Sequence, residues 1–382
     1  MKILILSNYY PPYYIGGYEL ACFDTVEYLK NAGHDVYVLT GDYKDCSQNF
    51  QRVYRKLRYI DYSNPSFLDK FKVEEFNYQT TKDVISKINP DLVYVWSLRL
   101  VSMSPLWAVE QSNVKKVFEI GDFWMKGFLS NSFFSKIKRR IKQVIPFFKS
   151  VEVQINPIIS VSSWMKKEMK DLYGSKQIFQ IPNGTKITKD KIEKNTAMMR
   201  YMFCGRIDYS KGLDLAIKAL SNIKDKKVLD FQFHIYGEGD ETYINRCKKM
   251  ITLLKLEDEV IFHGKSENLE KEYKKNHVLL MPTRMREPFG LVLIEAMNYG
   301  VVCLATNDYG PSEIIDDNKN GLLFDPLDVE DLTSKILKIH NNWDLLEEYR
   351  QKAYTKVANK FDINIVKKEV ENVLLQVAKS SE

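Results

Sequence analysis

The chain has 382 residues, which is too long for one typical hydrophobic core and suits two domains of about 150–200 residues each. With 45% hydrophobic and 28% charged residues it has the composition of a folded globular protein, and no stretch reaches the roughly 18 uninterrupted apolar residues of a membrane span. The net charge of +6 fits anionic ligands, an anionic membrane surface or nucleic acid, so charge alone does not choose a partner.

The first half of the chain alternates short apolar runs with amphipathic stretches. The runs predict strands at 2–7, 35–40, 92–95, 117–120 and 158–161. Helices are predicted between them, at 18–31, 76–87 and 164–172. Such alternation is typical of βαβ units, so we expect a parallel sheet covered by helices.

The same alternation starts again near residue 200. Strands are predicted at 201–204, 231–236, 260–263, 278–281 and 301–305, and helices at 213–223, 243–254 and 291–299. A stretch rich in Pro, Gly and Lys precedes this restart and marks a linker. We therefore expect an α/β protein of two Rossmann-like, doubly wound domains facing a central cleft, at 1–184 and 185–359. An amphipathic helix within 360–382 can cap either domain, and we assign it to the first.

Cysteine and histidine are placed as in a protein without a metal site. The five cysteines include no Cys-x-x-Cys pair, and the five histidines lie far apart. This pattern predicts free thiols in a reducing cytoplasm and no zinc. No Asp-x-Asp string occurs either, so we expect neither a metal nor another cofactor.

Two candidate sites follow predicted strands of the first half. Gly16 and Gly17 stand at a strand-to-helix turn, where backbone N–H groups can approach an anion, although a plain tight turn is about equally consistent. Asp122 stands just past a strand, beside Phe123 and Trp124. Its carboxylate can accept a hydrogen bond from a substrate hydroxyl or cap a helix.

Basic side chains follow the first strand of the second half. Arg206 and Lys211 are separated by a short loop with glycine on both sides. A guanidinium fork and a mobile ammonium can together neutralise a diphosphate. The alternative is a solvated basic loop before a helix. Gly237 follows the next strand, in a turn that lets a ribose or a base lie close to the backbone or merely turns the chain. We expect backbone contacts around Gly237 and at 263–265, including Lys265, to select the base.

Two glutamates eight residues apart form the strongest candidate site. Glu287 lies in a loop that contains Phe289 and Gly290, and a helix is predicted to begin at Leu291 and to carry Glu295. Each carboxylate can accept hydrogen bonds from its own hydroxyl pair, one on a sugar and one on a ribose. The helix start between them can face a diphosphate. The alternative is one acid at a helix start and one on the solvent face of the helix.

Apolar residues recur at helical spacing within 133–149, and Lys and Arg fill much of the remainder. A basic amphipathic helix of this kind can lie on an anionic membrane. It can equally be an ordinary surface helix that packs on its sheet.

These motifs together resemble those of the GT-B glycosyltransferases, in particular glycosyltransferase family four, over nearly the whole chain. The resemblance rests on Glu-x7-Glu at 287–295, Gly-Arg-x4-Lys-Gly at 205–212, Ile-Pro-Asn-Gly at 181–184 and the paired glycines at 16–17. One departure is that many members carry a histidine directly before the aspartate of the first-domain motif, where this chain has Gly121. We therefore expect no step that depends on histidine.

The resemblance implies a role for each matching residue. Arg206 and Lys211 would bind the donor diphosphate, Glu287 the donor sugar and Glu295 the ribose. The 16–17 loop would cover the diphosphate. The remaining expected site residues are Asp122, at a donor or acceptor hydroxyl, and Gly237, Lys265, Phe289, Gly290 and Leu291 at the donor.

The implied activity is retaining transfer of a hexose-type sugar from a nucleoside diphosphate donor, UDP- or GDP-linked, to an acceptor hydroxyl. The acceptor would be a sugar, a lipid-linked compound or a small molecule, in the biosynthesis of a glycan, glycolipid or glycosylated metabolite. We expect electrostatic stabilisation of the leaving diphosphate without a protein nucleophile or a metal. We expect no nucleic-acid partner, and a cytoplasmic location with contact to the inner membrane face through 133–149. The alternatives are a nucleotide-sugar epimerase of similar fold and a non-catalytic nucleotide-sugar-binding subunit.

Overall fold

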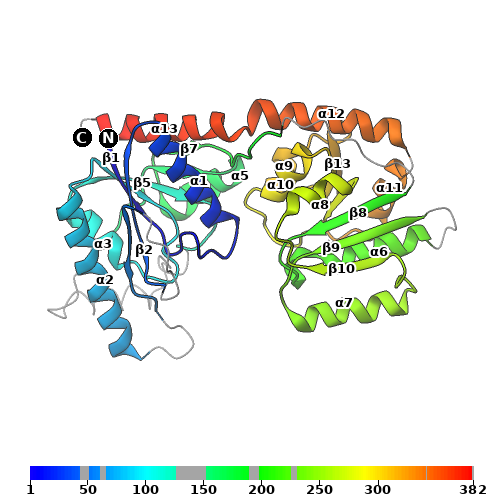
Figure 1. The fold of residues 1–382 in the computed structure, drawn as a ribbon, viewed down its shortest axis with the longest axis horizontal. Coiled ribbons are helices and arrows are strands. Elements are labelled where there is room, and N and C mark those ends of the chain that lie inside the picture. The colour runs from blue at the N-terminus through cyan, green and yellow to red at the C-terminus, as the bar shows by residue number, and fades with distance from the viewer. Residues whose placement is uncertain are drawn as a thin grey trace. The chain divides into compact units, whose positions relative to one another are not determined.

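The computed structural model describes residues 1–43, 51–60, 66–125, 152–188, 198–224, 230–340 and 342–380. They form two compact units: unit 1 is Met1–Ile181 with Lys367–Glu382, and unit 2 is Pro182–Val366. Each unit is built on a parallel sheet with flanking helices (Figure 1), so the predicted α/β class is confirmed. Within these ranges no helix has both the length and the apolar character of a membrane span. The segment 133–149, with its predicted membrane contact, lies outside the described residues.

Unit 1 contains a parallel sheet in the order β3-β2-β1-β4-β5-β6-β7. Its strands are β1 (Lys2–Leu6), β2 (Asp35–Gly41), β3 (Val53–Leu57), β4 (Leu92–Val95), β5 (Lys115–Ile120), β6 (Ile158–Ser160) and β7 (Ile178–Gln180). Its helices are α1 (Gly17–Asn31), α2 (Phe67–Ile88), α3 (Ser104–Gln111), α5 (Ser163–Tyr173) and most of α13 (Ile363–Lys379). Every residue of β4 is buried, as expected of a central parallel strand with both faces covered.

Local sequence signals set the helix ends in unit 1. The Ser66 hydroxyl accepts a hydrogen bond from the backbone N–H of Asp69 at 3.1 Å and so caps the start of α2. Asn89 ends that helix in the left-handed conformation, and Gly174 ends α5 in the same way.

The last residues of the chain pack on unit 1. The Lys115 ammonium donates to the carbonyl oxygen of Ala378 at 2.9 Å, and His34 Nε2 lies 3.0 Å from Glu371 Oε1. Lys367 is 5% exposed, and its ammonium lies 6.0 Å from the centre of the Trp96 ring. The C-terminal helix therefore contributes apolar and charged contacts to a sheet that begins at residue 2.

Unit 2 contains a second parallel sheet, in the order β10-β9-β8-β11-β12-β13. Its strands are β8 (Met199–Cys204), β9 (Phe231–Tyr236), β10 (Val260–Gly264), β11 (Val278–Met281), β12 (Val302–Thr306) and β13 (Gly321–Phe324). Its helices are α6 (Leu213–Lys224), α7 (Glu241–Leu253), α8 (Leu269–Lys275), α9 (Leu291–Asn298), α10 (Tyr309–Ile314), α11 (Val329–Ile339) and α12 (Trp343–Lys360), with the short 3-10 helix η1 (Tyr209–Lys211). The apolar faces of the strands and helices pack into one continuous hydrophobic core, which includes Tyr201, Phe233 and Leu220.

Some elements were not expected from the sequence. β3 reads Val-Tyr-Arg-Lys-Leu and lies at an edge of its sheet, so it shows no apolar run. β7 and β13 are only three and four residues long. Pairing with β6 and β12 defines these two strands.

Candidate functional site

The candidate residues of unit 2 lie after the carboxyl ends of its strands. Arg206 and Lys211 follow β8, Gly237 follows β9, Lys265 follows β10 and Glu287 follows β11. Because these strands are parallel neighbours, their carboxyl ends meet at one edge of the sheet, where ligands of open α/β sheets bind. The structure therefore gathers these residues at one edge, as the motif positions predicted.

Glycines hold the first two strand ends against each other. Gly205 and Gly237 have φ values of +138° and +144°. A Cβ at Gly237 would lie 1.9 Å from the carbonyl oxygen of Gly205, so no other residue fits without a backbone shift. Gly237 N–H donates to the carbonyl of Gly264 at 2.8 Å, which ties the third strand end to the same layer. The backbone segments that follow these three strands are thus packed closely against one another.

Lys211 and Glu287 form an ion pair across this edge. Lys211 Nζ lies 2.6 Å from Glu287 Oε2, and the two side chains are 21% and 14% exposed. The pair joins the loop after β8 to the loop after β11. The sequence placed Lys211 at a diphosphate and Glu287 at a sugar, and the structure puts their charged ends in direct contact.

Asp208 and Gly212 fix the position of Lys211. The Asp208 carboxylate accepts a hydrogen bond from the backbone N–H of Ser210 at 2.8 Å and so starts η1. Gly212 has φ +72°, and a Cβ there would lie 1.9 Å from the carbonyl oxygen of Pro282. The carbonyl of Ser210 accepts from the N–H of Arg284 at 2.7 Å. The lysine is therefore carried by a turn that is bonded to the neighbouring loop.

Arg206 projects from the same loop and has a 66% exposed side chain. Its Nε donates a short hydrogen bond to Asp208 Oδ2. Burial alone would raise the pKa of Asp208, but hydrogen bonds from Ser210 and Arg206 outweigh burial and hold that pKa below its ordinary value. An ionised Asp208 thus orients the guanidinium while leaving its outer nitrogens available to an anion.

Glu295 lies on α9 in a more enclosed setting than Glu287. Burial raises its pKa to about 7, and the hydrogen bond from the Tyr273 hydroxyl at 3.1 Å opposes that rise. The Tyr273 hydroxyl also lies 3.4 Å from Cys204 Sγ. The two glutamates therefore have different partners, Lys211 for Glu287 and Tyr273 for Glu295.

The turn between the glutamates is fixed by backbone packing. Gly290 has φ +111° and precedes Leu291, the first residue of α9. Phe289 is 4% exposed, and a Cβ at Gly310 would lie 2.4 Å from its carbonyl oxygen. The N-terminus of α9, with the positive end of the helix dipole, therefore begins four residues after Glu287.

Sequence reasoning missed two supporting residues, Tyr273 and Asp208. Tyr273 is buried in α8, a helix that was not expected, so nothing in the sequence linked it to Glu295. Asp208 does carry a signal, because an aspartate two residues before a serine in a loop is typical of a side chain that caps a turn.

In unit 1, the other candidates also follow strand ends. Gly16 N–H donates to Glu19 Oε2 at 2.9 Å, and Gly17 is the first residue of α1. Asp122, after β5, accepts from the N–H of Trp124 at 2.9 Å and from Arg99 at 2.8 Å. Its carboxylate closes a local turn and forms an exposed ion pair.

Gly121 lies against Tyr18. A Cβ at position 121 would lie 2.6 Å from the Tyr18 ring, whose hydroxyl donates to the carbonyl of Glu119 at 2.6 Å. Burial raises the pKa of the Glu119 carboxyl to about 7, while Tyr94 and Lys367 oppose that rise. The tyrosine ring thus fills the space that a side chain at position 121 would need.

Among the described residues, no three His, Cys, Asp or Glu side chains gather as they would around a metal ion. The four described cysteines are buried free thiols.

Comparisons with known proteins agree with this architecture. A model of Glycosyltransferase Family 4 matches residues 15–189, and one of the Glycosyl transferases group 1 matches residues 185–356. An uncharacterized glycosyltransferase of Methanocaldococcus jannaschii is 25% identical over 397 residues, which cover 98% of this chain and 97% of that protein.

Two solved structures share the fold over almost their whole length. Sucrose-phosphate synthase of Thermosynechococcus elongatus has a TM-score of 0.77 and 19% identity, with all of both chains covered. HepE of Anabaena, solved with UDP and glucose, has a TM-score of 0.72 and 19% identity, with 98% of this chain and 100% of that chain covered. The chain is a glycosyltransferase of the GT-B type. Within that class it resembles glycosyltransferase family four.

Proposed function

We propose that this chain transfers a hexose-type sugar from a nucleoside diphosphate to an acceptor hydroxyl, with retention of the anomeric configuration. The observation that carries the proposal is the Lys211–Glu287 pair, 2.6 Å apart at the carboxyl edge of the unit 2 sheet. It joins a cation suited to a diphosphate to an acid suited to sugar hydroxyls. The UDP and glucose bound by HepE make UDP-linked donors the first choice, with GDP-linked donors next.

In this mechanism the diphosphate would lie near Arg206, Lys211 and the N-terminus of α9. These groups are positive before the reaction begins, so they can stabilise the charge that develops on the leaving diphosphate. The acceptor hydroxyl would attack from the side of the leaving group, and the departing phosphate would take its proton. The protein then supplies no nucleophile. The two cationic side chains stabilise the charge on the leaving diphosphate, as a bound metal ion does in metal-dependent enzymes.

Glu287 has a second task in this proposal. It neutralises Lys211 in the free protein, and the arriving diphosphate would compete for the ammonium. A sugar hydroxyl that donates a hydrogen bond to Glu287 would then replace the bond that the carboxylate loses when Lys211 turns to the diphosphate. The acceptor would be a sugar, a lipid-linked compound or a small molecule, bound by unit 1 near Asp122 and the 16–17 loop. Free thiols fit action in the cytoplasm, the compartment that we propose.

Thermal unfolding with UDP, GDP, ADP and their sugars tests nucleotide binding. A nucleotide present at 100 times its dissociation constant should stabilise the protein by about 2.7 kcal/mol, and we expect UDP or GDP to do so. Product NMR with the donor that is found tests retention through the anomeric coupling. Unfolding curves that no nucleotide moves would overturn the donor assignment, and an inverted product would overturn the mechanism.

Lys211→Ala tests the leaving-group role. Removing one preorganised donor of this kind lowers turnover about 10²- to 10³-fold, so we expect a loss in that range in nucleotide-release assays. Lys249→Ala, which removes an exposed lysine of α7, is the matched control and should retain full activity. An unchanged rate for Lys211→Ala would refute this role.

A further inference from the structure

Unit 2 has a hollow away from the edge that carries Lys211. Its volume is about 530 Å³, within the range of small-molecule sites, and it lies between α12 and the turn at 316–320. That turn precedes β13, so it lies at the amino edge of the parallel sheet, opposite to the carboxyl edge. The lining residues are Asp316, Lys319, Asn320, Gln351, Lys352, Thr355, Lys356, Asn359 and Lys360.

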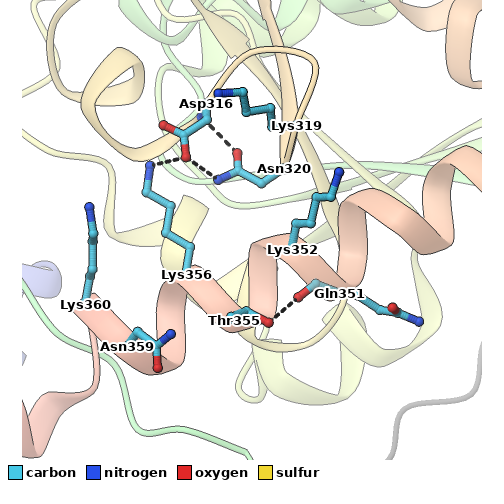
Figure 2. A pocket seen from close by; sticks show the side chains of 9 residues that line it. All are labelled: Asp316, Lys319, Asn320, Gln351, Lys352, Thr355, Lys356, Asn359 and Lys360. Atoms are coloured by element: carbon cyan, nitrogen blue, oxygen red, sulfur yellow. Dashed lines mark hydrogen bonds and ion pairs between the residues drawn. The ribbon is translucent and has the colours of Figure 1, made fainter.

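Lysines from two segments converge on this hollow. Lys352, Lys356 and Lys360 are four residues apart on α12, which places their Cα atoms on one face at intervals of about 6 Å. Figure 2 shows their side chains rising from α12 toward the 316–320 turn. Lys319 comes from that turn, on the other side. A helix C-terminus favours basic residues and could account for Lys360, but not for a lysine from a separate loop.

One of these lysines is fixed in place. Lys356 Nζ lies 3.0 Å from Asp316 Oδ2, and its side chain is 12% exposed. Asp316 is in turn held by Asn320, whose side-chain amide donates to it at 3.2 Å and whose oxygen accepts its backbone N–H at 2.9 Å. Lys356, Asp316 and Asn320 therefore form one hydrogen-bonded unit in the lining of the hollow (Figure 2).

The hollow keeps an excess of positive charge. Lys352 pairs with Glu348 and Lys356 with Asp316, so two of the four ammonium groups are compensated. For Lys319 and Lys360, no ion pair with another described residue occurs. Two uncompensated ammonium groups beside a concave surface concentrate the field on a bound anion.

The neutral residues of the lining indicate what accompanies the anion. Gln351, Thr355 and Asn359 also line the hollow. The Thr355 hydroxyl donates to the Gln351 carbonyl oxygen at 2.8 Å, and the Gln351 amide donates to Glu347 Oε1 at 3.1 Å, so each side chain keeps an oxygen that can accept a hydrogen bond. Such groups bind hydroxyls, and a volume of about 530 Å³ exceeds what one phosphate fills. We propose that this hollow binds a phosphate ester of a sugar or polyol, as a second site separate from the donor site. A soluble sugar phosphate and a glycerol-phosphate lipid headgroup share this chemistry.

Binding of glucose 1-phosphate, followed by calorimetry or ³¹P line broadening, tests the proposal. The background is Arg206→Ala/Lys211→Ala, in which the donor-site cations are absent, and binding should persist there. Lys319→Gln/Lys360→Gln in that background should weaken binding at least tenfold, because each lysine removed costs a charge-assisted hydrogen bond. Lys249→Gln/Lys255→Gln removes two exposed lysines elsewhere in unit 2 and should leave binding unchanged.

A vesicle sedimentation assay distinguishes a soluble sugar phosphate from a lipid headgroup as the source of the phosphate ester. Phosphatidylglycerol vesicles that sediment the background variant, but not its Lys319→Gln/Lys360→Gln form, identify a headgroup, with phosphatidylcholine vesicles as the blank. Glucose 1-phosphate binding without vesicle binding identifies a soluble ligand. Absence of both, or binding that the two glutamines leave intact, overturns the proposal. The donor site is disabled throughout, so failure here leaves the proposed sugar transfer standing.

Discussion

Glu295 offers a direct test of the ribose contact, because its pKa of about 7 lies in the accessible pH range. At pH 7 about half of the free protein carries the protonated acid. Ribose hydroxyls donate to the carboxylate, so binding should lower this pKa and drive the proton off. Nucleotide binding at pH 7 should therefore release about half a proton from this residue.

The pH dependence follows from the same numbers. With a pKa of about 7, the ionised fraction rises from about one tenth at pH 6 to about nine tenths at pH 8. If only the carboxylate binds ribose, affinity should rise roughly tenfold over this range, or about 1.4 kcal/mol. Stability changes in the opposite direction. The folded state holds this proton more tightly than the unfolded chain. Protonated Glu295 therefore contributes up to about 3 kcal/mol to the free energy of unfolding below pH 4.5, and this contribution is lost as pH rises through 7.

Calorimetry in buffers of different ionisation enthalpy measures the released proton directly, with the nucleotide that the unfolding screen selects. Glu295→Gln is the control, because it keeps the side-chain shape but has no proton to lose, whereas the nucleotide phosphate titrates equally in both proteins. The buried Glu119, whose pKa is also about 7, is present in both as well. Equal proton release and parallel pH curves for the two proteins would refute the assignment of Glu295 to the ribose.

Three glycine substitutions test the packing at the strand ends, two in unit 2 and one in unit 1. Gly237→Ala should lower the free energy of unfolding of unit 2 by about 2–4 kcal/mol, because φ is +144° and the new Cβ would lie 1.9 Å from a carbonyl oxygen. Gly264 has φ +69°, and a Cβ there would have no atom within 4 Å. Gly264→Ala therefore tests backbone strain without overlap and should lower the free energy of unfolding by only about 1–2 kcal/mol. Urea unfolding that ranks the two equally would contradict this reading. Gly121→Ala should destabilise unit 1 by about 1–3 kcal/mol through overlap with the Tyr18 ring, and a Tyr18→Ala background should remove most of that cost in a double-mutant cycle. Additive effects there would show that the ring does not occupy this space.

The sequence predicted the α/β class and the strands that carry the site, because apolar runs and glycine turns at their ends are local signals. The ranges 201–204, 231–236 and 278–281 match β8, β9 and β11 closely. β3 could not be recognised, since an edge strand with Arg55 and Lys56 is defined by its pairing partner and not by its composition.

The candidate site was predictable in position but not in its internal contacts. The motifs placed Arg206, Lys211 and Glu287 after neighbouring strands, and the structure brings them to one edge. The direct Lys211–Glu287 pair depends on how two loops 76 residues apart bend toward each other, which no local pattern encodes. Likewise, the raised pKa of Glu295 follows from burial beside Tyr273, a tertiary contact. The roles of these residues in catalysis stay predictions.

The packing of the C-terminal helix on unit 1 has a consequence during synthesis. The partners of His34 and Lys115 are Glu371 and Ala378, which are translated after all of unit 2. Unit 1 therefore lacks part of its covering layer until unit 2 has been translated, whereas every strand described in unit 2 has been translated by residue 324. A nonsense codon shortly before residue 367 would spare unit 2 and leave an apolar face of unit 1 open to chaperones and proteases.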